Sequence, residues 1–69
     1  MGIREKIGAE LRALRMEKEL TIGELAELCG LTHTNIVKIE DGRYNVRLDT
    51  VDVIARALGA ELLIAKRDK

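Results

Sequence analysis

The chain has 69 residues, and its twelve basic and twelve acidic side chains leave no net charge, with an isoelectric point near 6.6. A single core of this size supplies only about 3–5 kcal/mol of stability, so such domains commonly need a disulfide, a metal or a partner. Cys29 is the one cysteine and His33 the one histidine, which excludes an internal disulfide and a structural zinc site. A binding partner is therefore the remaining source of additional stability. Because the charges balance, any binding to nucleic acid must depend on where the charges lie.

The sequence has no signal peptide, no apolar run approaching about 18 residues and no lipidation motif. Repeats and low-complexity segments are absent as well. We therefore expect one soluble, cytoplasmic domain that has no contact with a membrane.

The first element is expected to be a helix over residues 3–18. Apolar residues recur there at the spacing of one helical face, namely at Ile3, Ile7, Leu11 and Leu14. The charged residues of this segment fall on the other sides, as in a helix that covers a core.

Two short helices follow, and each begins at a threonine. Thr21 and Glu24 have the spacing of a capping box, in which each side chain bonds the other residue's backbone N–H. The helix that they begin is expected to end near Gly30, because glycine readily takes the left-handed conformation found after a helix. Thr32 caps the next helix, which is expected over 32–41.

The segment 43–47, RYNVR, is expected to be a polar connection to a fourth helix over 48–58. Apolar residues recur in that helix at helical spacing, namely at Val51, Ile54, Ala55 and Leu58. Gly59 is expected to end it.

Residues 61–68, ELLIAKRD, depart from this pattern. Leu62, Leu63 and Ile64 form a short apolar run, which favours a strand of about five or six residues; the alternative is a frayed extension of the fourth helix. A lone strand has an unpaired edge, and its simplest partner is the same strand of a second copy across a twofold axis. We therefore expect residues 60–69 to be a dimerisation element.

Residues 21–41 together have the pattern of a helix-turn-helix. Ala26 is small enough for two helices to cross closely, Gly30 turns the chain, and apolar positions fix the crossing angle. Those apolar positions are Leu25, Cys29, Leu31, Ile36 and Ile39. A generic pair of packed helices can give the same pattern, but the number of positions that agree at fixed spacing favours a DNA-reading unit.

The motif LT-x-x-ELA-x-x-x-GLT-x-x-x-I-x-x-IE-x-G, which begins at Leu20, is more specific than a bare helix-turn-helix. With it, residues 3–59 resemble the Cro/repressor-type helix-turn-helix of the xenobiotic-response-element (XRE) family. The resemblance implies an all-α, compact four-helix, lambda-repressor-like domain over residues 1–59. Members of that family are mostly DNA-binding transcriptional regulators, phage repressors and antitoxins of toxin–antitoxin pairs.

In such a domain the second helix of the motif lies in the major groove, with its first residues against base edges. Short polar side chains can form hydrogen bonds there, asparagine suits the N6 and N7 atoms of adenine, and an apolar residue suits a thymine methyl group. The expected base contacts are His33, Thr34, Asn35, Val37 and Lys38. The alternative is that these five residues form an ordinary solvated helix face.

The resemblance also implies phosphate contacts, which position a domain rather than specify sequence. They come from the start of the first motif helix and from the loop after the recognition helix. The corresponding residues are Thr21, Ile22, Arg43, Tyr44, Asn45 and Arg47. Because residues 43–47 contain no carboxylate, we expect this loop to be locally basic.

Arg15 and Glu40 match positions that form an ion pair in many relatives. The resemblance therefore implies a partly buried pair that fixes the angle between the first helix and the recognition helix; the alternative is two surface charges worth less than about 1 kcal/mol.

Three residues depart from the family pattern: Ile22 stands where glutamine is common, Val46 where proline is usual, and Leu28 where a polar residue is usual. With the zero net charge, these departures predict modest affinity for DNA per copy.

Other function classes fit less well. An enzyme is disfavoured because the chain has no serine, and His33 and Cys29 have no sequence context that suggests a catalytic pair. Single-strand binding uses stacked aromatic rings, and Tyr44 is the one aromatic residue. An antitoxin that binds a toxin protein and its own promoter is the serious alternative, although we expect no segment beyond the short tail to wrap a toxin.

The sequence thus predicts a regulator that binds double-stranded DNA sequence-specifically, without a cofactor or a metal. Acting as a homodimer, it would hold two recognition helices about 34 Å apart on a near-palindromic operator. Repression of a promoter is what the family resemblance implies.

Overall fold

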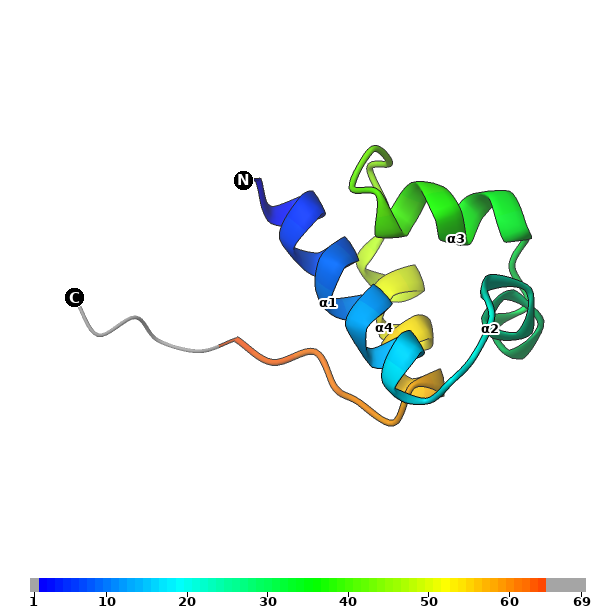
Figure 1. Cartoon of the computed structure of the whole chain (residues 1–69). Coiled ribbons are helices and arrows are strands. Elements are labelled where there is room, and N and C mark those ends of the chain that lie inside the picture. The colour runs from blue at the N-terminus through cyan, green and yellow to red at the C-terminus, as the bar shows by residue number, and fades with distance from the viewer. Residues whose placement is uncertain (1, 65–69) are drawn as a thin grey trace.

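The computed structural model describes residues 2–64, which form four helices around one core (Figure 1). The helices are α1 (Ile3–Glu17), α2 (Ile22–Cys29), α3 (His33–Glu40) and α4 (Leu48–Ala57). α3 contacts α1 and α2, while α4 lies behind α1 in Figure 1 and also contacts α2. The predicted all-helical, four-helix fold is confirmed. No helix among the described residues combines the length and the hydrophobicity needed to span a membrane.

Both threonine caps are formed. The Thr21 hydroxyl oxygen accepts a hydrogen bond from the Glu24 N–H at 3.0 Å, and the Thr21 N–H donates to the Glu24 carboxylate at 2.8 Å. The Thr32 hydroxyl oxygen accepts from the Asn35 N–H at 3.1 Å. Because each cap is made by residues close in sequence, α2 and α3 begin where the sequence predicts.

The four helix ends share one arrangement. Each helix is followed by a residue with positive φ, after which the next N–H bonds to a carbonyl five residues back. Three of these residues are glycines: Gly30 at 70°, Gly42 at 72° and Gly59 at 73°. After α1 the residue is Glu19, with φ 56°, the only non-glycine with positive φ among residues 2–64. An L side chain is strained in this conformation, so the α1–α2 turn stores strain that the other three ends do not.

The core takes apolar residues from all four helices, as the predicted stripes require. Its buried members are Leu11, Leu25, Ala26, Ile36, Ile39, Ile54, Ala55 and Leu58, and Val51 is buried as well. Ile7 and Leu14 are half-buried against this cluster. Ile3 was predicted on the same stripe, but its side chain is 68% exposed because it lies in the first turn of α1, outside the core.

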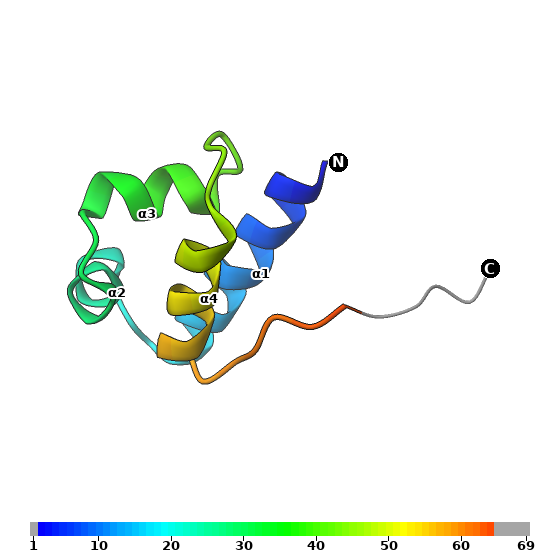
Figure 2. The same ribbon diagram turned by 180° about the vertical axis from the view of Figure 1, so that it is seen from behind.

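After Gly59 the chain leaves the four-helix body (Figures 1 and 2). Residues 61–64 have no regular secondary structure, and α4 ends at Ala57, so neither the predicted strand nor the extended helix is present there. A strand needs a second edge for its hydrogen bonds, and a single copy offers none. Residues 65–68, the other half of the predicted strand, lie outside the described residues. The strand and its dimer pairing therefore stay predictions.

Candidate nucleic-acid interface

The outer side of α3 carries the residues predicted as base contacts. His33, Thr34 and Lys38 are exposed, whereas Asn35 and Val37 are half-buried and border the exposed surface. The opposite side of the helix is buried in the core. Thr34 and Lys38 lie one helical turn apart, so α3 presents a short polar surface to an approaching ligand.

Backbone donors add to this surface at the start of α3. The N–H groups of Asn35 and Ile36 are bonded to the hydroxyl and the carbonyl of Thr32. The N–H groups of His33 and Thr34 come one turn too early to have acceptors inside the helix. They point outward with the positive end of the helix dipole, which suits a phosphate oxygen.

The start of α2 holds the first pair of predicted phosphate contacts. Thr21 is exposed, and its hydroxyl can still donate a proton while its oxygen caps the helix. Ile22 is different, because its side chain is half-buried and packs against the core. The predicted contact at Ile22 is therefore reduced to its backbone N–H, at the first position of the helix.

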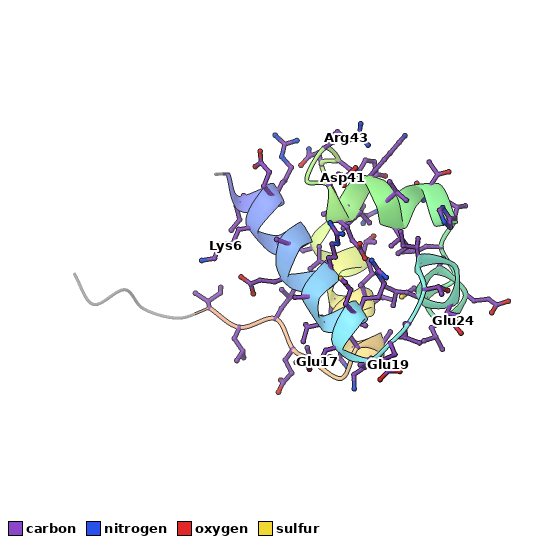
Figure 3. The ribbon with its side chains drawn as sticks, viewed as in Figure 1. Lys6, Glu17, Glu19, Glu24, Asp41 and Arg43 are labelled. Atoms are coloured by element: carbon purple, nitrogen blue, oxygen red, sulfur yellow. The ribbon has the colours of Figure 1, made fainter. Side chains whose placement is uncertain are left out.

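The loop after α3 exposes the other predicted phosphate contacts, namely Arg43, Tyr44, Asn45 and Arg47. The loop itself contains two arginines and no carboxylate, but carboxylates on either side of it offset part of the expected positive charge. Arg43 donates to Asp41 at 2.8 Å (Figure 3), and Arg47 lies 3.7 Å from Asp49. All four side chains of these pairs are exposed, so each pair is weak and its arginine can exchange the carboxylate for a phosphate.

Arg15 of α1 and Glu40 of α3 form the ion pair that the family resemblance implies. The Arg15 Nε donates to Glu40 Oε2 at 2.7 Å and its Nη2 to Oε1 at 3.0 Å, while Nη1 donates to the carbonyl of Leu20 at 2.9 Å. The side chains are only 11% and 6% exposed. The hydrogen bonds to Glu40 raise the pKa of Arg15 above its ordinary value, although burial opposes them. The pair ties the end of α3 to α1 and to the α1–α2 turn.

Gly8, which the sequence analysis did not single out, and Gly42, the last residue of the motif, bring α1 against the same end of α3. A Cβ atom at Gly8 would overlap the carbonyl oxygen of Ile39 and lie 2.6 Å from that of Glu40. A Cβ atom at Gly42 would lie 2.6 Å from the Cα of Glu5. A signal for Gly8 was present in the sequence: glycine inside a helix costs about 1 kcal/mol relative to alanine, which suggests a packing reason.

A family model described as a helix-turn-helix domain matches residues 6–64. The match extends over α2, the turn at Gly30 and α3, whose geometry is that of the motif. The chain belongs to the helix-turn-helix domain family. It is a DNA-binding domain of the XRE, Cro/repressor type, so the predicted family is confirmed.

Relatives within this helix-turn-helix family carry the names of regulators. The immunity repressor protein of Bacillus phage phi105 is 38% identical over 56 residues, which are 81% of this chain but 39% of the repressor. An HTH-type transcriptional regulator of Methanothermobacter thermautotrophicus is 47% identical over 51 residues, 74% of each chain. The chain therefore spans about two-fifths of the phage protein and three-quarters of the archaeal one.

A solved helix-turn-helix structure agrees with these relatives. The crystal structure of the clp gene regulator ClgR from Corynebacterium glutamicum matches with a TM-score of 0.87 at 34% identity, over 90% of this chain and 80% of that chain. All three proteins are named as repressors or regulators. The antitoxin alternative gains no support from them.

Proposed function

We propose that the chain regulates transcription, as a repressor, by binding double-stranded DNA through α3. One observation supports this function best: α3 has a polar outer side, and contacts with α1 fix the C-terminal end of the same helix. Arg15–Glu40 and the close crossing at Gly8 hold that end, so the exposed residues keep a fixed direction. A fixed direction matters because base-edge hydrogen bonds need defined geometry.

In this proposal the first turns of α3 enter the major groove. Thr34 and Lys38 make hydrogen bonds to base edges, with guanine as the natural partner of Lys38. His33 and Asn35 contact bases or phosphates at the start of the helix, and Val37 contacts a thymine methyl group. The exposure of His33, Thr34 and Lys38 favours them as the main readers.

Phosphates on either side of the groove position the domain. Thr21 and the first backbone N–H groups of α2 bind one strand, and Arg43, Tyr44, Asn45 and Arg47 bind the other. Since both arginines must leave carboxylate neighbours, their gain on binding is smaller than that of free cations. This supports the modest affinity per copy that the neutral charge also predicts.

Two copies are proposed to bind one operator. The exposed Leu62, Leu63 and Ile64 supply an apolar segment for pairing between copies within residues 60–69. The recognition helices would then lie about 34 Å apart, one turn of DNA, and read a near-palindromic site. Occupying such a site within a promoter is the means of repression.

A selection from a randomised duplex library, at near-physiological salt with excess competitor DNA, tests this function. Enrichment of a palindrome with half-sites about ten base pairs apart is the expected result. Folded protein that enriches no sequence would contradict sequence-specific DNA reading.

A further inference from the structure

A furrow on the side of α1 that faces away from α3 takes no part in the proposed DNA contacts. Ile3, Lys6, Ile7 and Glu10 of α1 line one wall, and residues 61–63 line the other. Figure 3 shows Lys6 pointing from α1 away from α3, toward the side where the tail leaves the body. The furrow encloses about 400 Å³, which is room for apolar side chains rather than for a single water molecule.

Beside this furrow, the tail carries an apolar side chain, Ile64, that is not buried within its own copy. Leu62 lines a smaller apolar cavity between α1 and α4, so its side chain faces the body. Ile64 lies beyond the body and is fully exposed, and Leu63 is 81% exposed. One copy of the chain therefore carries both a furrow with apolar side chains from α1 and the tail and an exposed isoleucine that does not fill it.

We propose that the furrow of each copy receives Ile64 of a second copy, so that α1 forms half of the dimer interface. This rests on the proposed function, in which the tails of two copies pair. In an extended segment Leu62 and Ile64 point to the same side. If two tails pair antiparallel about Leu63, Ile64 of one copy lies opposite Leu62 of the other, beside that copy's furrow.

The charges at the furrow permit this contact. Its walls carry one cation, Lys6, and two anions, Glu10 and Glu61, and none of the three forms an ion pair among residues 2–64. A twofold interface brings identical faces together, so Lys6 of each copy is available to offset the carboxylates of the other. Isoleucine side chains at Ile3 and Ile7 supply the apolar contact, and Ile3 loses its 68% exposure.

The contact also links the dimer to DNA reading through α1. Glu5 and Gly8 pack against the end of α3 in the same copy. Ile3 and Ile7, in the same two turns of α1, contact Ile64 of the second copy. The spacing of the two recognition helices is then set through a single rigid helix in each copy.

Sedimentation equilibrium of variants tests the furrow. Ile3→Glu and Ile64→Ser are each expected to raise the dimer dissociation constant by about tenfold or more, because each removes apolar contact twice in a symmetric dimer. Leu48→Glu is the matched control: Ile3 and Leu48 are both the first residue of a helix, are 68% and 73% exposed, and tolerate an acid there. The proposal is overturned if Ile3→Glu raises the dimer dissociation constant no more than Leu48→Glu does. It is also overturned if the wild-type chain stays monomeric.

A disulfide trap adds a test of which residues meet. In a Cys29→Ala background, an Ile3→Cys chain is mixed with a tagged Ile64→Cys chain under mild oxidation, and a cross-link between the two is expected; Leu48→Cys in place of Ile3→Cys should give none. Failure of the furrow contact and failure of the proposed DNA reading give different results. A protein that selects a palindrome without this cross-link refutes the furrow alone, whereas one that cross-links but selects no sequence refutes DNA reading alone.

Discussion

Helix α3 and the segment after Gly59 are both short and carry isoleucines, but they differ in how the rest of the chain restrains them. Ile36 and Ile39 of α3 are buried, and the end of the helix is held by Arg15 and by the close approach of Gly8. Ile64 touches no core, and residues 61–64 form no regular structure. The difference indicates that contacts within one copy hold α3 in place, whereas they do not order residues 61–64 into a regular element.

Removing the ion pair should have the largest effect on the restraint of α3. Arg15→Met leaves the Glu40 carboxylate buried without its partner, so we expect a loss of about 3 kcal/mol or more in the free energy of unfolding, measured by urea titration. Arg56→Met is the matched control, because Arg56 also pairs through Nε with an aspartate, but on an exposed surface. The control should lose less than about 0.5 kcal/mol.

A double variant sharpens this prediction. Arg15→Met with Glu40→Met removes both charges and should regain much of the lost stability. Equal losses for Arg15→Met and Arg56→Met would show that the pair does not hold α3.

A methyl group at the crossing of α1 and α3 should have the next largest effect. Gly8→Ala places a Cβ atom against two backbone carbonyls, which cannot move aside as a flexible side chain does, so we expect a loss of about 2 kcal/mol. Gly23→Ala is the control, since a Cβ atom there meets nothing closer than 3.9 Å. It should be neutral or stabilising by up to about 1 kcal/mol, because alanine favours the helix. A stable Gly8→Ala protein would mean that the crossing tolerates adjustment.

The smallest effect is expected at Glu19, in the turn after α1. Glu19→Gly relieves the strained φ at the end of α1 and should raise stability by about 0.5–1 kcal/mol in thermal or urea unfolding. Gly30→Ala makes the reverse change at a site where a Cβ atom meets nothing within 4 Å, so its loss of about 1 kcal/mol would be purely conformational. Destabilisation by Glu19→Gly would indicate that the Glu19 side chain makes a needed contact.

The predictable parts of the molecule are those with local signals. The capping box at Thr21 and Glu24, the turn at Gly30 and the cap at Thr32 involve residues at most five positions apart, so the bounds of α2 and α3 follow from the sequence. The apolar spacing of Ile36 and Ile39 likewise identifies the buried side of α3, and thus its exposed side.

The remaining features depend on contacts between distant parts of the chain. Gly8 lies against the end of α3, whose residues are more than 30 positions away in the sequence. The residue types around Gly8 do not show which distant residues it approaches. Arg43 pairs with Asp41, which lies outside residues 43–47, so the composition of the loop alone did not show that part of its positive charge is offset. The tail is harder still, because its predicted strand needs hydrogen bonds from a second copy.

The most direct test of DNA reading by α3 is a parallel library selection with wild-type protein, Thr34→Ala, Lys38→Ala and the control Arg56→Ala. Removing one base contact should cost about 1–3 kcal/mol and erase the preference at one or two positions of each half-site, with helicity unchanged by circular dichroism. Arg56→Ala removes a positive charge from α4 and should select the wild-type site. If Thr34→Ala and Lys38→Ala also select the wild-type site with wild-type affinity, the outer side of α3 does not read the bases.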